Sequence, residues 1–413
     1  MSVPVTNIAS GHEGTLKDQV SAYISRLKNG EMGSLPAIGA TIALALLFAK
    51  LSPYFLTTLN ITNLFVQAAE LTMLSSALVF VILLAEIDLS AGVTAGVAMA
   101  VFIQLIKAWH WAWIPALVAS FVVGAIIGWV IGFLVAKIGV PSFVVTLAFF
   151  LGFQGLQLVL LGEGGVYRVE TPQILAIMNN NLAAWGGWLL VFGSAAAAFV
   201  IGIWDRGRRS AAGLINKPLS MLLIKVASIV VLGGLVVVIM NQDRSQGIIP
   251  IMGVPIVVPI TVIILFIGTF VLDRTKFGRH LYAIGGNPEA ARRAGIKVAR
   301  IRIYAFMVCA VLAVVSGVFH ASRIGSVDGS AGRTIVLSGV ASAVVGGVSL
   351  FGGRGRLSNA AIGAVVITMI DNGLGLLQMP AGINYLVEGG VLLLAATIDA
   401  LARRRSGASL ARV

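Results

Sequence analysis

The chain has 413 residues, of which 58% are hydrophobic and 11% charged, and its mean hydropathy is +0.98. Soluble globular domains carry about 25% charged residues, so this composition excludes that class and favours helices of roughly 20 apolar residues that cross a bilayer. The net charge of +13 does not indicate nucleic-acid binding, because the basic residues gather in loops on one side of the predicted bundle, as the positive-inside rule describes. We predict an all-α polytopic membrane protein embedded in the lipid bilayer.

The chain begins with a polar segment, residues 1–34, and the first apolar run starts only near Leu35. This pattern does not resemble a cleaved signal peptide. Four apolar residues of the segment share one helical face: Leu16, Val20, Ile24 and Leu27. That spacing is compatible with a short interfacial helix, and an irregular tail is an equally good interpretation. We expect a cytoplasmic N-terminal segment.

We predict about twelve transmembrane helices, with ten as the lower bound, in one transmembrane domain over residues 35–401. The predicted spans are 35–51, 64–85, 89–107, 113–136, 142–161, 185–204, 219–240, 254–272, 303–321, 334–351, 357–378 and 383–401. An even number of spans places both termini on one side of the membrane. With both termini inside, 22 of the 29 Lys and Arg residues lie on the inner side and 6 on the outer side. This asymmetry favours cytoplasmic termini, with residues 402–413 as a basic cytoplasmic tail.

Small residues recur every four positions in two of the predicted spans. One set is Gly92 and Gly96, and the other is Gly124, Gly128 and Gly132. Such spacing lets the backbones of two helices approach closely. We interpret both sets as packing positions and not as sites of chemistry.

The first polar cluster between apolar segments is Ala85–Gly92, which carries Glu86, Asp88 and Ser90. It could be a cytoplasmic turn whose acids are solvated. It could equally be a break between helices inside the membrane, where Asp88 and Ser90 cap the next helix beside a permeation path.

The second polar cluster follows Pro141, which opens a predicted span. Ser142 and Thr146 share a face of this span, and Phe143 lies between them. These residues could line a polar pathway for a hydroxylated solute. Hydrogen bonding between helices is the competing interpretation and is worth about 1 kcal/mol per contact.

The third polar cluster lies near the C-terminus. Asp371 and Asn372 are deep in one predicted span, and Glu388 is in the next. Ionisable groups inside a membrane are costly and therefore call for a functional hypothesis. These acids could face a water-filled cavity, or they could be protonated and hydrogen-bonded.

Residues 273–302 form the longest charged segment between two spans and contain eight of the 29 basic residues. Within the segment, Asn287 is a good N-cap, Pro288 suits the first helical position, and Glu289 places an acid in the first turn. Gly295 is a typical helix end. A short rigid helix over 288–294 could dock a cytoplasmic partner. A positively charged loop that only fixes topology is an equally good interpretation.

We find no catalytic constellation in the sequence. The four histidines are scattered without metal-ligand spacing, and there is no glycine-rich loop ending in Gly-Lys-Ser or Gly-Lys-Thr for a nucleotide. The single cysteine, Cys309, allows no disulfide within the chain. We therefore expect a transport subunit without cofactors and not an enzyme, so any ATP hydrolysis would belong to another subunit.

Four segments in this order resemble the permease subunits of bacterial monosaccharide ABC importers of the ribose, xylose, arabinose and galactose class. They are EIDLSAG (86–92), GVPSFVVTLA (139–148), TKFGRHLYAIGGNPEAARRAGI (275–296) and SGVASAVVGGVSLFGGRGRLSNAAIGA (338–364). The likeness extends from about residue 40 to residue 400. Extra spans over about 185–240 favour the longer xylose-type permeases. The acid Glu86 departs from the family pattern, so no family role is carried over to it.

This resemblance implies a homodimeric permease in the bacterial inner membrane. A periplasmic binding protein would deliver a monosaccharide, and a cytoplasmic ABC ATPase would dock at loop 273–302. The segment that would couple to the ATPase comprises Gly285, Gly286, Asn287, Pro288, Glu289, Ala290, Ala291, Arg292, Arg293 and Gly295. The candidates for the translocation path are Asp88, Ser90, Ser142, Phe143, Thr146, Asp371 and Asn372.

Two alternative functions stay open. A proton-coupled secondary transporter would use Glu86, Asp88, Asp371 or Glu388 as a proton relay, and would partly tolerate deletion of 287–295. The same ABC machine could also carry a different polar solute, such as a polyol.

Overall fold

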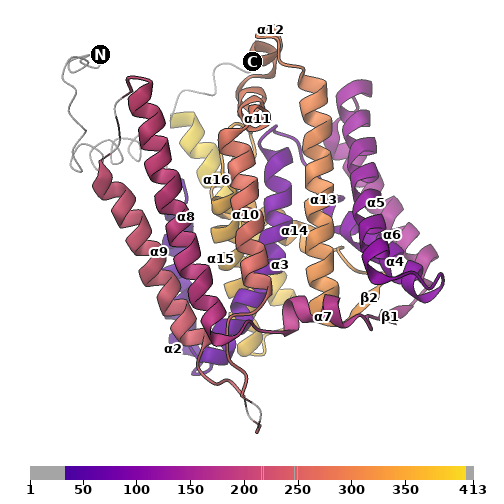
Figure 1. Cartoon of the computed structure of the whole chain (residues 1–413). Coiled ribbons are helices and arrows are strands. Elements are labelled where there is room, and N and C mark those ends of the chain that lie inside the picture. Colours follow the sequence, from indigo (N-terminus) through magenta and orange to yellow (C-terminus); the bar gives the residue numbers. More distant parts are fainter. Residues whose placement is uncertain (1–32, 215, 217, 246, 249, 406–413) are drawn as a thin grey trace. The chain divides into compact units, whose positions relative to one another are not determined.

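The computed structural model of the chain describes residues 33–405, apart from residues 215, 217, 246 and 249. The interfacial helix expected over residues 16–27 and the last eight residues of the expected basic tail lie outside this described part. The described chain separates into two compact units (Figure 1). The larger unit joins Met32–Asn180 to Pro255–Arg404, and the smaller unit contains Asn181–Val254.

The larger unit is built from helices and one pair of short strands. Its first half contains α2 (Leu35–Leu51), α3 (Thr58–Ile82), α4 (Ala91–Lys107), α5 (Trp113–Phe133), the π-helical turn η1 (Leu134–Ile138), α6 (Ser142–Leu161), β1 (Val166–Arg168) and α7 (Pro172–Asn179). Its second half contains α10 (Val257–Arg274), α11 (Lys276–Gly286), α12 (Pro288–Arg293), α13 (Val298–Ile324), β2 (Ser326–Asp328), α14 (Ile335–Val345), α15 (Leu357–Leu376) and α16 (Ala381–Arg405). Within this unit, α12 lies at the opposite end from α7, β1 and β2 (Figure 1).

The two strands join distant parts of the chain. β1 and β2 pair antiparallel, with Val166 opposite Asp328 and Arg168 opposite Ser326. β2 follows α13 after Gly325, whose φ of +75° ends that helix. The pair of strands therefore ties the connection after α6 to the end of α13.

The smaller unit contains the helices α8 (Ala184–Ala211) and α9 (Leu219–Met240). Arg244 is buried at the end of α9 and donates hydrogen bonds to the carbonyl oxygens of Met240 and Gly253, the latter at 3.0 Å. These bonds join the end of α9 to the segment that leads into α10.

The prediction of an all-α polytopic membrane protein is confirmed. Each of the twelve predicted spans coincides with a helix, and nine described helices are long and apolar enough to cross a membrane. The other three, α2, α4 and α14, are apolar but shorter.

Two helix boundaries differ from the prediction for identifiable reasons. α3 begins six residues before the expected start at residue 64, because the side chain of Thr57 caps it by accepting a hydrogen bond from the Asn60 amide. α14 ends at Val345, six residues before the expected end at residue 351. Gly347 follows with a φ of +101°, a left-handed conformation that ends a helix.

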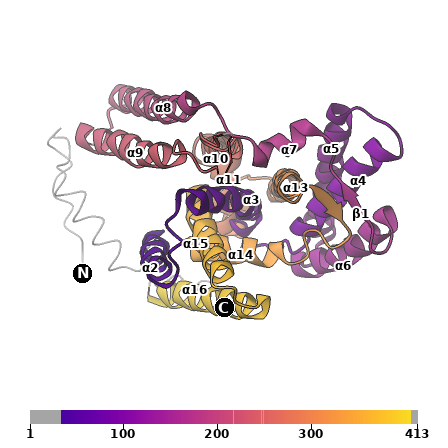
Figure 2. The same cartoon turned by 90° about the horizontal axis from the view of Figure 1, so that it is seen from below.

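The core of the larger unit is centred on α3. Of the residues in its most apolar stretch, 83% are buried inside the protein, whereas none in the corresponding stretch of α16 is fully buried. α3 lies between α13 and α15 when the unit is viewed end-on (Figure 2).

The expected packing role of the glycines in α5 is confirmed on α13. A Cβ atom on Gly128 would lie 2.5 Å from the carbonyl oxygen of Phe306, and one on Gly132 would lie 2.7 Å from the Cα atom of Ile303. Both neighbours are backbone atoms, so α5 and α13 cross at a distance that only glycine allows.

Replacing Gly128 by valine should therefore destabilise the protein. Because the side chain would displace the backbone of α13, we expect a loss of more than the 1–3 kcal/mol typical of an overpacked core. The measurement is the unfolding midpoint of the purified protein in detergent. Gly152→Val in α6 is the matched control, since no atom lies within 4 Å of a Cβ atom at that position. Equal midpoints for both variants would contradict this packing.

Candidate functional site

The charged segment between α10 and α13 folds as two helices, α11 and α12. The side chain of Asn287 caps α12 by accepting hydrogen bonds from the amides of Glu289 and Ala290, at 3.0 and 2.9 Å. Pro288 is the first helical residue, and Gly295 has a φ of +82° after the helix end. Both ends are thus fixed by local chemistry, as the sequence predicted.

The surface of α12 is charged and exposed. Arg292 and Arg293 form ion pairs with Glu289 at 3.1 and 3.6 Å, and all three side chains are at least 57% exposed. Ion pairs of this kind contribute about 0.3–0.5 kcal/mol to a helix. These groups are therefore accessible to another protein at little energetic cost.

The end of α11, which leads into α12, is packed against the end of α3. A Cβ atom on Gly285 would clash with the carbonyl oxygen of Leu83 and with the amide of Gly353. That same amide donates a hydrogen bond of 2.9 Å to the Leu83 carbonyl. Three backbone segments, from α3, α11 and the glycine-rich loop after α14, therefore meet without side chains between them.

A tyrosine joins α11 to the same loop. The hydroxyl of Tyr282 donates a hydrogen bond of 2.7 Å to the carbonyl oxygen of Gly355. Burial, together with the charge of Asp273, raises the pKa of Tyr282 to about 12. The phenol therefore keeps its proton, and hence this hydrogen bond, at physiological pH.

Glu86 has a partner that the sequence did not reveal. Its carboxylate lies 3.2 Å from the guanidinium of Arg302, and both side chains are largely buried, at 12% and 27% exposed. Arg302 lies in the first turns of α13, shortly after α12. The acid that departs from the family pattern thus links the α3–α4 connection to the base of α13.

The first two polar clusters form one buried assembly around the α3–α4 connection. Asp88 accepts hydrogen bonds from the Ser90 hydroxyl and amide, at 2.6 and 2.9 Å. Ser142 accepts a bond of 3.4 Å from the Ile87 amide, and Thr146 donates one of 3.2 Å to the Ile87 carbonyl. The connection is therefore a buried turn held by the start of α6. Phe143, which lies between Ser142 and Thr146 in the sequence, has a side chain that is 52% exposed.

A separate polar cavity of about 330 Å³ lies among α3, α13, α14, α15 and α16. Eleven of its fourteen lining residues are polar, and Asp371 and Glu388 are among them. Ser338 donates a hydrogen bond of 2.7 Å to Glu388 across the cavity. The volume falls in the range of small-molecule sites. Asp371 is the one predicted path residue that lines it.

Asn372, the neighbour of Asp371, lies outside this cavity. Its amide exchanges two hydrogen bonds with the amide of Asn60 on α3, at 2.9 and 3.0 Å. The reciprocal pair satisfies both side chains and joins α15 to α3. Its geometry is that of an interhelical contact.

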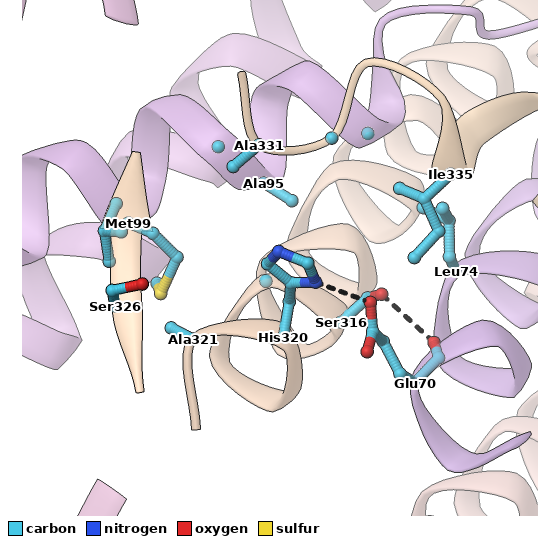
Figure 3. A pocket seen from close by; sticks show the side chains of 15 residues that line it. Glu70, Leu74, Ala95, Met99, Ser316, His320, Ala321, Ser326, Ala331 and Ile335 are labelled. Carbon is cyan, nitrogen blue, oxygen red and sulfur yellow. Dashed lines mark hydrogen bonds and ion pairs between the residues drawn. The ribbon is translucent and has the colours of Figure 1, made fainter. Parts of the chain in front are cut away.

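Glu70 carries the strongest ionic interactions in the cavity wall. Its buried carboxylate lies 2.8 Å from Nδ1 of His320 and 2.8 Å from Nε of Arg323. Ser316 also donates a hydrogen bond of 3.1 Å to the Glu70 carbonyl oxygen. Figure 3 shows Glu70, Ser316 and His320 together, with Met99 and Ala95 on the other side of the histidine. Glu70 and His320 also border a second, smaller cavity of about 20 Å³, which has room for about one water molecule.

Sequence reasoning missed this group of three residues. A signal was present, since Glu70 is an acid in the middle of an apolar span, and His320 and Arg323 are three residues apart on another. The pairing itself could not be read, because the partners are about 250 positions apart.

A bundle of apolar helices around a polar cavity, with a capped charged helix at one end, defines a membrane transport protein. Residues 60–396 match the family described as branched-chain amino acid transport system / permease component. The chain belongs to this family of transport permeases. The predicted multi-pass location in the inner membrane is thereby confirmed.

Individual relatives agree with this assignment. The chain is 34% identical to the xylose transport system permease protein of Escherichia coli, over 94% of this chain and 96% of that protein. It is 29% identical to the D-allose transport system permease protein of the same organism, over 86% and 88% of the two chains. It is also 29% identical to the Escherichia coli ribose import permease protein, over 91% and 96%. These relatives confirm the predicted resemblance to sugar permeases and its xylose-type branch. No solved structure matches the chain.

Proposed function

We propose that this permease is the membrane-spanning subunit of an ATP-driven importer for a monosaccharide, such as xylose or a related pentose or hexose. The named substrates of its relatives are sugars, which supports the substrate class. The observation that carries the coupling role is α12, whose exposed charges directly follow the end of α11 that is packed against the end of α3. A separate cytoplasmic ATPase would dock there and hydrolyse ATP.

α3 and α13 would transmit the movement of α12 to the cavity. Near α12, Glu86 binds Arg302, and at the cavity Glu70 binds Arg323. The two ends of α13 are thus held to the middle of α3 and to the connection that follows α3. Because packed interiors are stiff and move as units, displacement of α12 would change access to the cavity.

Two further partners belong to the proposal. A periplasmic binding protein would deliver the sugar to the outer face, and a second copy of the chain would complete a homodimer. The coupling residues 285–295 and the path residues named from the sequence are proposed in these roles. Among the path residues, Asp371 has the best support because it lines the cavity.

The proposal predicts that import requires three proteins and ATP. We expect liposomes that contain the permease and its ATPase to accumulate xylose, or a related sugar, only when ATP is inside and the binding protein is outside. Omitting any one protein should reduce uptake to the level of empty liposomes. Radiolabelled sugar uptake and phosphate release would be measured together.

The opposite result would favour a proton-coupled transporter. Uptake by this chain alone, driven by a pH gradient without ATP, would overturn the importer. Of the four acids that such a relay could use, Glu86 and Asp88 are engaged by Arg302 and Ser90. Asp371 and Glu388 would then be the residues to replace.

A further inference from the structure

The polar cavity contains groups that call for a ligand. The Oδ1 atom of Asn384 is buried and accepts no hydrogen bond within the described part of the chain. A buried acceptor without a donor costs about 1–3 kcal/mol. Asn384 and Tyr385 enter the cavity from α16, beside Glu388 and opposite Asp371 of α15. A solute with hydroxyl groups would supply the missing donor.

The charges in the wall favour a neutral solute. The cation Arg323 is already held by Glu70 at 2.8 Å, and the other oxygen of that carboxylate binds His320. Asp371 and Glu388 add further carboxyl groups to the same cavity. An anionic solute would meet like charges here, whereas the hydroxyl groups of a sugar can both donate to carboxylates and accept from amide and hydroxyl donors.

The lining also disfavours an amino acid with a branched apolar side chain. Only Leu71, Ile335 and Ala381 are apolar among the fourteen lining residues. Burying an aliphatic side chain stabilises a complex in proportion to the apolar surface that covers it. The wall of this cavity has little apolar surface. At roughly 30 Å³ per water, the volume of about 330 Å³ holds about eleven waters that a polyhydroxylated solute could replace.

We propose that this cavity is the site where the permease holds its solute, and that it selects a neutral polyhydroxylated compound through Asp371, Asn384 and Glu388. The inference rests on the proposed function and adds to it the location and chemistry of the site. Glu70, His320 and Arg323 form its fixed wall. A probe at position 338 should detect whether a solute occupies the cavity, because the Ser338 hydroxyl contacts Glu388.

Cysteine protection tests the site directly. In the full chain with Cys309→Ser, a cysteine replaces Ser338, and its reaction with a small methanethiosulfonate reagent is followed in the reconstituted complex. Thr334→Cys, at the cavity edge, is the second variant in case Ser338→Cys does not fold. Glu163→Cys, on an exposed loop outside the cavity, is the control.

We expect xylose or ribose to slow labelling at Ser338→Cys and Thr334→Cys but not at Glu163→Cys. At ten times the half-protecting sugar concentration, about nine-tenths of the sites are occupied, so labelling should slow about tenfold. Leucine should not protect. Asp371→Asn and Glu388→Gln should raise the half-protecting sugar concentration.

Two results would overturn the site, and they bear differently on the proposed function. If sugar does not change the labelling in complexes whose parent protein imports xylose, the proposed site is wrong, but the proposed function as a sugar importer still holds. If leucine protects the cysteine in a complex that imports no sugar, both the proposed site chemistry and the proposed function are wrong.

Discussion

Reversing the charges of Arg292 and Arg293 together should abolish ATP-driven import while the permease stays folded. Both side chains are exposed and pair only weakly with Glu289 on their own helix, so the cost to folding is small. At an interface, in contrast, placing like charges together costs several kcal/mol. At 1.4 kcal/mol per factor of ten, affinity for the ATPase should fall by about a hundredfold or more. Co-purification of the ATPase and sugar uptake would both be measured.

A matched control separates docking from the general charge of the loop. Lys276→Glu with Arg279→Glu makes the same change in net charge on α11, outside α12. We expect this variant to import at close to the parental rate. Undiminished import by the α12 variant, or equal loss in both variants, would contradict a specific coupling role for α12.

Removing the charge of Glu70 should produce the largest loss of stability among single substitutions in the cavity wall. Glu70→Gln leaves Arg323 without its buried carboxylate and weakens the contact to His320. Breaking a fully buried ion pair by removing one partner costs about 3–5 kcal/mol. Because the remaining partner Arg323 is 35% exposed, water compensates part of its charge, and we expect a loss of about 1–3 kcal/mol. The free energy of unfolding of the purified permease would be measured by denaturant titration in detergent.

A double-substitution cycle identifies the cause of that loss. Glu70→Gln with Arg323→Gln should be less destabilised than the sum of the two single variants, because no buried charge is left unpaired. Glu163→Gln on an exposed loop should stay within about 0.5 kcal/mol of the parent. A strictly additive double variant would show that the pair does not stabilise the wall.

The sequence alone predicted features that depend on neighbouring residues. Hydropathy located a helix for each predicted span, since a run of apolar residues is itself the property that the bilayer selects. The capped helix α12 was predicted for a similar reason. Asn287, Pro288 and Gly295 act on backbone groups within a few residues of themselves, so their effect can be read in order along the chain.

At the site, the sequence left two interpretations of the polar residues open. Ser142, Thr146, Asp88 and Asp371 were grouped as one possible path because all are polar residues near apolar runs. In the structure the first three hold a buried turn, and only Asp371 lines the cavity. Polarity inside a membrane protein signals that a partner is needed, but it does not distinguish a structural partner from a solute.

Tertiary structure decided which residues meet. The Asn60–Asn372 pair joins positions 312 residues apart, and Glu70 and His320 are separated by 250. Such pairs depend on how α3 packs against α15 and α13, and therefore on the volumes of many side chains at once. The composition and local pattern of the chain thus determined that it is a helical membrane protein with a capped charged helix. Only packing placed the end of α11, which leads into that helix, against the end of α3 and formed a polar cavity further along α3. The reason is that hydrogen bonds and ion pairs between helices are set by distance in space and not along the sequence.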